Sequence, residues 1–322
     1  MMAAWRNDRR RPRFDHPAAA RLAVLENEAL GGRAKRSLSG VRARWPLVLG
    51  LALAGCSPLA AFNAVVPKDR AGAKVASAIA YGEGPRRALD VYAPTGPRTG
   101  ARPVVVFFYG GSWSSGARSG YAFVGRALAA QGFVAVIPDY RLVPEVRYPS
   151  FVEDGAAAVR WAEAHALDYG GDPDRIVLMG HSAGAYIAAM LALDDRWLGP
   201  DRAPVKGFVG LAGPYDFAPF DVPASQAAFG SWPNPAETQP VTWAGAGDPP
   251  TLLLVGAKDA TVNPRNSEAL ARKLRAGGVP VEVRSYPGLG HVGTLLALAR
   301  PFRRKAPAVE DVRRFVERVA GR

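Results

Sequence analysis

The chain has 322 residues, 48% of them hydrophobic, which is long enough for one large domain or two small ones. Its formal net charge of +13 is unevenly distributed: residues 1–55 carry 11 Lys and Arg against 4 Asp and Glu, a contribution of +7, and the remaining residues carry 30 against 24, a contribution of +6. The second contribution is spread without an evident basic patch, so composition and charge disfavour nucleic-acid binding.

Residues 1–55 have the composition of a basic leader that ends in a secretory signal. The apolar run at 45–55 is too short to span a bilayer comfortably and matches the core of a signal peptide. It ends in the sequence LAGC at 53–56, which resembles a bacterial lipobox, where the cysteine becomes the lipidated first residue of the mature protein. We therefore expect a lipid anchor on Cys56 at the bacterial cell envelope, followed by a linker over 56–75. A short hydrophobic anchor or a buried helix is the alternative.

Residues 1–40 are Arg-rich and have no hydrophobic core, although a signal peptide normally begins close to its start codon. One interpretation is that translation begins near Val41, from an alternative start codon. The other is a genuine basic extension on a cytoplasmic protein, in which the weakly amphipathic segment 18–30 forms a helix.

Strand and helix patterns alternate continuously after about residue 75, which predicts a single α/β domain over 76–322. An apolar strand at 103–108 is followed at once by Tyr109, Gly110 and Gly111. Paired glycines let backbone N–H groups approach a substrate carbonyl oxygen closely, as an oxyanion hole requires. A plain glycine turn is the alternative, and a nucleophile further along the chain favours the oxyanion hole.

The most informative motif is GHSAG at 180–184. It lies between an apolar strand at 175–179 and a helix at 185–193 that is rich in Ala and Leu. A serine at such a turn sits in strained backbone, so small residues are needed two positions to either side of it. We therefore predict that Ser182 is a nucleophile and that the N–H of Ala183 completes the oxyanion hole. The other elements predicted before this turn are a strand at 134–137 and a helix at 150–165.

A segment rich in Pro, Gly and aromatic residues, 213–248, follows a predicted strand at 205–211. It has no long helical period. Two of its aromatic residues, Tyr215 and Trp232, are candidate pocket residues. For each of them a place in an irregular packed loop is the alternative. Further aromatic candidates in the segment are Phe217, Phe220 and Phe229.

A serine hydroxyl is a weak nucleophile and needs a base, which in turn needs an orienting acid. Both should follow strand ends later in the chain, the acid first. Asp259 lies in the loop after a clean apolar strand at 251–256 and is the predicted acid. Its alternative role is a turn or helix-cap aspartate. Asp248 precedes that strand and would lie at the wrong edge of the sheet.

The chain has four histidines. His16 lies in the leader, and His165 lies in an Ala-rich helical stretch. His181 adjoins the serine, and we expect its side chain to point away across the turn. His291 follows a predicted strand at 281–286 in a glycine-flanked loop and is therefore the predicted base. The remaining predicted helices are 264–276 and 309–319.

These motifs together resemble the α/β-hydrolase superfamily, in its small esterase and lipase-like branch, from residue 89 to the last helix. The resemblance implies a mostly parallel central sheet flanked by helices, with 213–248 as a short lid. The loop YGGSW at 109–113 is similar to the His-Gly-Gly-x-Trp oxyanion motif of that branch, with Tyr109 in place of the histidine. Trp113 matches the tryptophan of that motif, and the resemblance implies that it packs against the loop and helps to wall the pocket. This change weakens an arylformamidase assignment more than a general esterase assignment.

The sequence therefore predicts a serine esterase that cleaves short-chain acyl or carbohydrate-linked esters, since the lid is too short for long-chain triglycerides. Neither a metal nor a cofactor is expected, because there is no Cys/His cluster and no phosphate-binding loop. An amidase, arylformamidase or peptidase of the same fold is the enzymatic alternative. The other is a non-catalytic surface lipoprotein that binds a ligand or partner, although such proteins usually lose a triad member. The sequence makes no prediction of oligomeric state.

Overall fold

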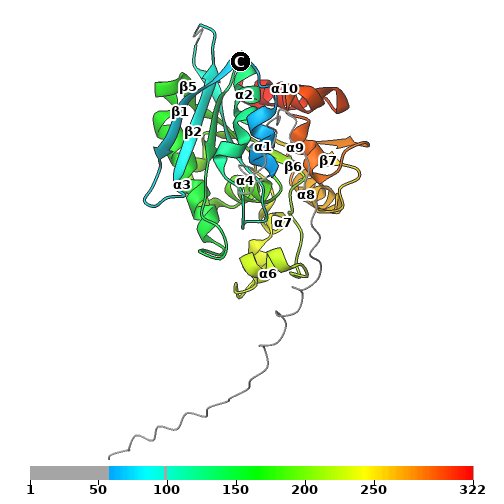
Figure 1. The fold of residues 1–322 in the computed structure, drawn as a ribbon. Coiled ribbons are helices and arrows are strands. Elements are labelled where there is room, and N and C mark those ends of the chain that lie inside the picture. The colour runs from blue at the N-terminus through cyan, green and yellow to red at the C-terminus, as the bar shows by residue number, and fades with distance from the viewer. Residues whose placement is uncertain (1–57, 98–99, 322) are drawn as a thin grey trace, which may run out of the picture. The chain divides into compact units, whose positions relative to one another are not determined.

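A computed structural model describes residues 58–97 and 100–321, and it contains one eight-stranded sheet of order β1-β2-β4-β3-β5-β6-β7-β8 (Figure 1). All neighbouring strands from β4 to β8 are parallel, and β2 is antiparallel to both β1 and β4. The strands are β1 Gly72–Ala80, β2 Ala88–Pro94, β3 Arg102–Phe108, β4 Val134–Pro138, β5 Gly171–His181, β6 Val205–Leu211, β7 Thr251–Gly256 and β8 Val281–Tyr286.

The central strands are almost continuous apolar runs because helices cover them. Helix α2 packs on β1, β2 and β4 and touches α10, while α3 and α4 pack against each other and on β5. The α-helices are α1 Pro58–Val65, α2 Ala122–Ala130, α3 Ser150–His165, α4 Ala183–Leu193, α5 Asp195–Leu198, α6 Pro223–Phe229, α7 Pro240–Trp243, α8 Arg265–Ala276, α9 His291–Leu296 and α10 Ala308–Ala320. The 3₁₀ turns are η1 Arg118–Tyr121, η2 Ala166–Tyr169, η3 Gly199–Arg202, η4 Pro235–Thr238 and η5 Arg300–Lys305.

The expected elements agree closely with the observed ones. Strands β6, β7 and β8 and helix α3 have the predicted bounds, and the sheet is mostly parallel and flanked by helices, as an α/β-hydrolase fold requires. Strand β5 begins four residues earlier than expected, at Gly171. The segment 213–248 contains only short helices, namely α6, η4 and α7.

The segment 56–75 is not a plain linker in its described part. Helix α1 occupies residues 58–65, and β1 begins at Gly72. The Phe62 ring packs against the rings of Phe123 and Phe302, at centroid distances of 5.4 and 6.0 Å. The expectation of a linker was wrong here because a short apolar helix next to an apolar leader has no separate sequence signature.

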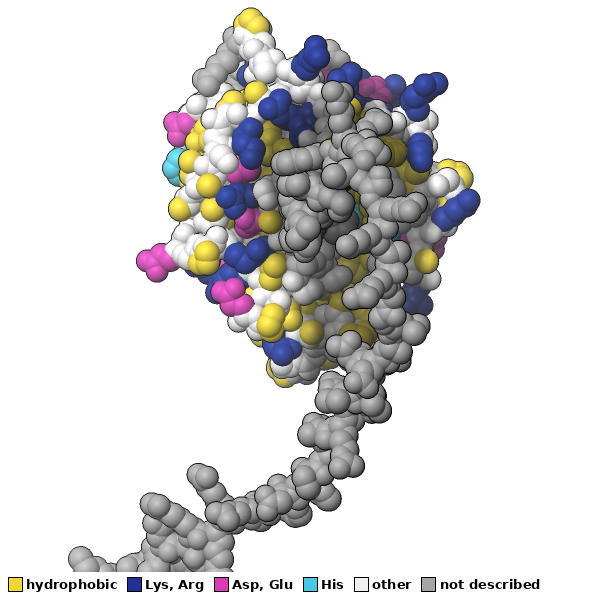
Figure 2. Space-filling model, in the orientation of Figure 1, with side chains coloured by type: hydrophobic (Ala, Val, Ile, Leu, Met, Phe, Trp, Pro, Cys, Tyr) yellow, Lys and Arg dark blue, Asp and Glu magenta, His cyan; other side chains and the backbone are white. Residues whose placement is uncertain are grey.

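The predicted signal and the lipidation site at Cys56 lie outside the described residues. Within residues 58–97 and 100–321, no helix is long and apolar enough to cross a membrane. On the face in Figure 2, Lys and Arg side chains are spread over the described surface, with Asp and Glu among them, and are not gathered over one element.

Candidate active site

The turn between β5 and α4 is a sharp elbow with Ser182 at its tip. Ser182 has φ 54° and ψ −124°, a strained conformation for a residue with a side chain. A Cβ on Gly180 would lie 2.3 Å from the carbonyl oxygen of Gly184, and a Cβ on Gly184 would lie 2.1 Å from that of Phe108. Only glycine therefore fits on either side of the elbow, which is the physical basis of the sequence motif.

Three distant segments meet at this elbow. His291 begins α9, and its Nε2 lies 2.8 Å from the Ser182 Oγ. Its Nδ1 lies 2.8 Å from Oδ2 of Asp259, whose side chain is buried. Asp259 follows β7, and its Oδ1 accepts the N–H groups of Thr261 and Val262 at 2.9 Å. These bonds fix the carboxylate, so its other oxygen can hold the imidazole in the tautomer that accepts a proton from the serine.

Asp248, the rival acid, lies elsewhere. Its carboxylate accepts hydrogen bonds from the Gly245 N–H and from the Arg202 guanidinium, at 2.8 and 3.1 Å. It therefore anchors the end of the 213–248 segment to η3 and has no contact with His291.

His181 lies closer to the base than the sequence suggested. Its buried ring is 4.9 Å from the His291 ring, centroid to centroid, and its Nε2 is 3.2 Å from the His291 carbonyl oxygen. Burial lowers the pKa of His181 to about 3, with the nearby His291 as a second cause, so the ring is neutral. A neutral imidazole that faces a carbonyl through Nε2 must carry its proton there. His181 therefore donates to the backbone of the predicted base.

The glycine loop after β3 lies directly against the elbow. A Cβ on Gly110 would be 2.9 Å from the Ser182 Cβ. Among the described residues, no hydrogen-bond acceptor is found for the N–H groups of Gly110, Gly111 or Ala183. The loop continues through Ser112 and Trp113, which have positive φ of 53° and 56°. Unpaired N–H groups beside a serine hydroxyl are the arrangement that an oxyanion hole needs.

Tyr109 anchors this loop through its hydroxyl. The hydroxyl donates to Oδ1 of the buried Asp139 at 2.7 Å and accepts from Arg86 Nη2 at 2.9 Å. Arg118 forms a further ion pair with Asp139. Burial raises the pKa of Tyr109, so the phenol stays protonated. A tyrosine thus occupies the position of the family's histidine and braces the loop by a polar side-chain contact.

The three candidate pocket residues have different surroundings. Trp113 is buried in an aromatic cluster, stacked on Phe217 and edge-on to Phe229. Trp232 is half-buried and lies edge-on to the ring of Tyr148. The cluster also contains Phe151 and Tyr186.

Tyr215 is a core residue and does not line this aromatic cluster. Its ring packs edge-on to Phe208 of β6. Its hydroxyl lies close to two glycine backbones, since a Cβ on Gly210 or Gly213 would be 2.0 or 2.4 Å from that oxygen. The pocket assignment of Tyr215 was wrong because the sequence of an irregular segment does not indicate which way a side chain faces.

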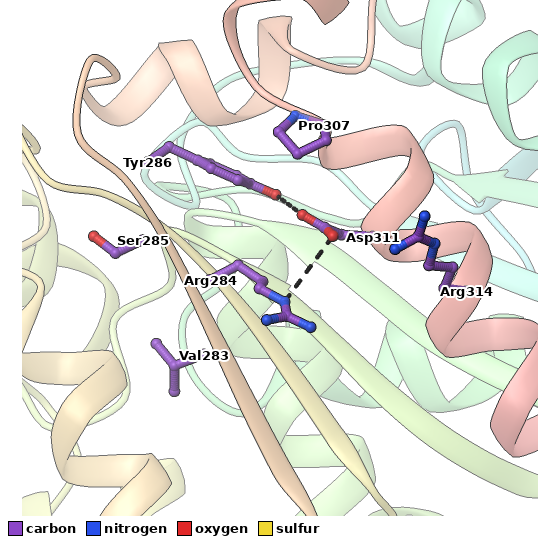
Figure 3. A pocket seen from close by; sticks show the side chains of 7 residues that line it. All are labelled: Val283, Arg284, Ser285, Tyr286, Pro307, Asp311 and Arg314. Atoms are coloured by element: carbon purple, nitrogen blue, oxygen red, sulfur yellow. Dashed lines mark hydrogen bonds and ion pairs between the residues drawn. The ribbon is translucent and has the colours of Figure 1, made fainter.

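Two further features of the described residues were compared with the elbow: side-chain groups that could hold a metal ion, and a second cavity. Among residues 58–97 and 100–321, no His, Cys, Asp and Glu side chains are grouped so that they could hold a metal ion. A shallow cavity of about 570 Å³ lies between β8 and α10, where Tyr286 and Arg284 both contact Asp311 (Figure 3). It contains no nucleophile–base pair.

Comparisons with known proteins agree on the fold and the family. Residues 89–274 match the BD-FAE family. Esterase LipC of Mycobacterium tuberculosis is 31% identical over 247 residues, which cover 69% of this chain and 60% of LipC. A probable isoprenylcysteine alpha-carbonyl methylesterase of Oryza sativa subsp. japonica is 38% identical over 154 residues, which cover 44% of this chain and 35% of that protein. The chain thus spans about a third to three fifths of these relatives.

Solved structures resemble the whole described fold. A carbohydrate esterase from gut microbiota superposes with a TM-score of 0.70 at 20% identity, covering 80% of this chain and all of that one. Esterase B from Lactobacillus rhamnosis superposes with a TM-score of 0.70 at 21% identity, covering 81% and 91% of the two chains. At these identities the likeness establishes the fold.

Proposed function

The chain belongs to the BD-FAE family of α/β-hydrolases, and on that basis we propose that it is a serine esterase that hydrolyses carboxylic esters through an acyl-enzyme. The observation that carries this proposal is the continuous hydrogen-bonded row from Ser182 through His291 to Asp259, with both links at 2.8 Å. The esterase names of its relatives support the same reaction.

The proposed reaction has two steps of acyl transfer. Ser182 Oγ attacks the ester carbonyl while His291 Nε2 accepts its proton, and Asp259 stabilises the imidazolium that forms. The N–H groups of Gly110, Gly111 and Ala183 stabilise the oxyanion. His291 then protonates the leaving alcohol, and the ester bond breaks. Water repeats the sequence on the acyl-enzyme and releases the acid and the free serine.

The first test is the Ser182→Ala variant. We expect it to lose hydrolysis of a short p-nitrophenyl ester by at least about 10⁴-fold, because removal of the nucleophile stops acyl-enzyme formation. Ser285→Ala, which removes an exposed hydroxyl on β8, is the matched control and should keep wild-type turnover. A fluorophosphonate probe should label wild type and the control but not Ser182→Ala. Undiminished turnover by a folded Ser182→Ala protein would contradict the proposed mechanism.

We propose that the substrates are short-chain acyl or carbohydrate-linked esters. The cap over 213–248 supports this class, because its longest helix, α6, has only seven residues and a long acyl chain would need a larger apolar cover. A panel of acetyl, butyryl and feruloyl esters, with matched amides and formamides, tests the proposal. Ester turnover well above amide turnover would support it, and preferred amide or formamide cleavage would favour the alternative activity.

We also propose that Cys56 is lipidated and attaches the protein to the bacterial cell envelope. The lipobox-like sequence at 53–56 is the support for this proposal. Metabolic labelling with a palmitate analogue should mark the wild-type protein and fail to mark Cys56→Ala.

A further inference from the structure

Two buried tyrosines hold the loop that carries Gly110 and Gly111. The Tyr140 hydroxyl donates to the carbonyl oxygen of Tyr109 at 2.8 Å, and the Tyr121 hydroxyl donates to the carbonyl oxygen of Gly110 at 3.3 Å. Both side chains are buried. Burial raises the pKa of both phenols, so the two hydroxyls remain protonated donors at neutral pH.

The two carbonyls belong to the peptide bonds that supply the proposed oxyanion donors. In a trans peptide the C=O and the following N–H point in opposite directions. The Tyr109 carbonyl therefore sets the direction of the Gly110 N–H, and the Gly110 carbonyl sets that of the Gly111 N–H. Hydroxyls that hold both carbonyls on the buried side turn both N–H groups to the opposite side, where no described acceptor competes for them.

The hydroxyls themselves are held by a stack of three tyrosine rings. The Tyr109 ring lies between the other two, 5.0 Å from the Tyr121 ring and 4.8 Å from the Tyr140 ring, with interplanar angles of 18° and 25°. Tyr109 is fixed at its far end by Asp139 and Arg86. Stacked rings with one fixed member leave the two hydroxyls little freedom to follow a rotating peptide.

We propose that Tyr121 and Tyr140 are positioning residues that orient the Gly110 and Gly111 N–H groups toward the oxyanion. Neither tyrosine touches the substrate, and each acts through one peptide plane. The inference rests on the proposed function, in which those two N–H groups stabilise the tetrahedral intermediate. The two tyrosines are not part of the YGGSW motif at 109–113, since Tyr121 and Tyr140 lie 10 and 29 residues after Gly111 in the chain.

Kinetics of Tyr121→Phe, Tyr140→Phe and the double variant test the proposal. We expect each single change to lower kcat by about 10-fold, a fraction of the ~100- to 1000-fold that follows loss of a whole donor. KM should stay within about 2-fold, because the lost stabilisation exists only in the transition state. Affinity for a trifluoromethyl ketone, which forms an oxyanion on the serine, should fall by the same factor as kcat.

Tyr286→Phe is the matched control. It removes a tyrosine hydroxyl that donates to Asp311 at 2.7 Å, in the cavity of Figure 3, outside the glycine loop. It should lower thermal stability to a similar extent as the single variants while kcat stays at the wild-type value. A purely structural role for Tyr121 and Tyr140 would make all of these variants behave alike, and that result would overturn the proposal.

A measurement that does not depend on turnover tests the role of the two tyrosines separately from the proposed function. Crystal structures of the single variants and the double variant should show the 109–110 or 110–111 peptide plane rotated from its wild-type orientation. Planes that stay in place in all of them would overturn the inference, whatever the activity. A wild-type protein that cleaves no ester would instead contradict the proposed function, and the peptide planes would still decide the role of the two tyrosines.

Discussion

At the residue scale, His181 shows how burial sets the chemistry of a side chain beside the proposed catalytic base. Its Nε2–H reaches the His291 backbone, and its Nδ1 has no described partner. A charged ring at this place would lie 4.9 Å from the His291 ring and would oppose the imidazolium that the proposed acyl transfer needs. Burial removes this conflict by keeping His181 neutral, and the consequence is a cost in stability at acidic pH.

Proton linkage determines how the His181 contribution to the free energy of unfolding depends on pH. The pKa of His181 falls from 6.5 in the unfolded chain to about 3 in the folded protein, so between these values the unfolded state binds one more proton. His181 therefore does not change the free energy of unfolding above pH 6.5, and it lowers the free energy of unfolding as the pH falls from 6.5 toward 3. At about 1.4 kcal/mol per pH unit, wild type should lose about 2 kcal/mol from this residue between pH 6.5 and 5.

Replacement of His181 by glutamine tests this linkage. Glutamine keeps a donor for the His291 carbonyl and does not titrate. Urea unfolding at pH 7 and pH 5 should show a smaller loss of unfolding free energy in His181→Gln than in wild type, by about 2 kcal/mol. From pH 7 to pH 9 the two proteins should show the same pH dependence. Equal losses from pH 7 to pH 5 would mean that His181 is protonated in the folded protein.

The predicted triad could be located from sequence because each member follows the end of a strand that the sequence pattern predicts. Ser182, Asp259 and His291 stand after β5, β7 and β8, and parallel strands bring those ends to one edge of the sheet. Tyr121 could not be found in this way, because its role depends on the direction of one hydroxyl. The same limit explains the wrong pocket assignment of Tyr215.

At the element scale, α1 is tied to α2 by one side chain. The N-cap of α2 is Tyr121, whose side chain makes no capping bond. Asn63 of α1 supplies the cap from a distance, since its Oδ1 accepts the Phe123 N–H at 3.1 Å and its Nδ2 donates to the Ser119 carbonyl at 2.8 Å. Helix α2 thus receives from α1 the acceptor that its own N-cap does not provide.

The Asn63→Ala variant should therefore destabilise the protein by about 2 kcal/mol, because it leaves a buried N–H and a carbonyl without partners. Chemical denaturation measures this loss. Asn234→Ala, on the exposed surface before η4, is the control and should change the unfolding free energy by less than about 0.5 kcal/mol. An unchanged midpoint for Asn63→Ala would show that water replaces the cap.

The strands differ in how clearly their sequence pattern identifies them. Strand β7, TLLLVG, is buried at every residue and had its bounds predicted. Strand β1, GAKVASAIA, is an edge strand with mostly exposed and half-buried residues and irregular pairing, and the sequence predicted no strand there. Strand β8, VEVRSY, is the other edge strand, and its bounds were predicted because it alternates apolar and polar residues, a pattern that β1 lacks.

At the scale of the whole molecule, the boundary of the folded unit lies before residue 76. The segment from α1 to β1 is held by the Phe62 ring contacts with Phe123 and Phe302 and by a two-bond ion pair between Asp69 and Arg303, at 2.9 and 2.6 Å. Strand β1 adds the pairing along β2. A chain cut within this segment exposes apolar rings that the rest of the domain buries.

Two truncations distinguish the observed boundary from the expected one. A chain of residues 58–322 should keep wild-type kcat/KM and a melting temperature within about 3 °C, because α1 and β1 are intact. A chain of 76–322 should be insoluble or melt at least about 10 °C lower, because it loses α1, the Asp69 ion pair and the first four residues of β1. Both chains lack Cys56, so acylation does not affect the comparison. Equal melting temperatures for the two truncated chains would show that the rest of the domain is equally stable without α1 and the start of β1.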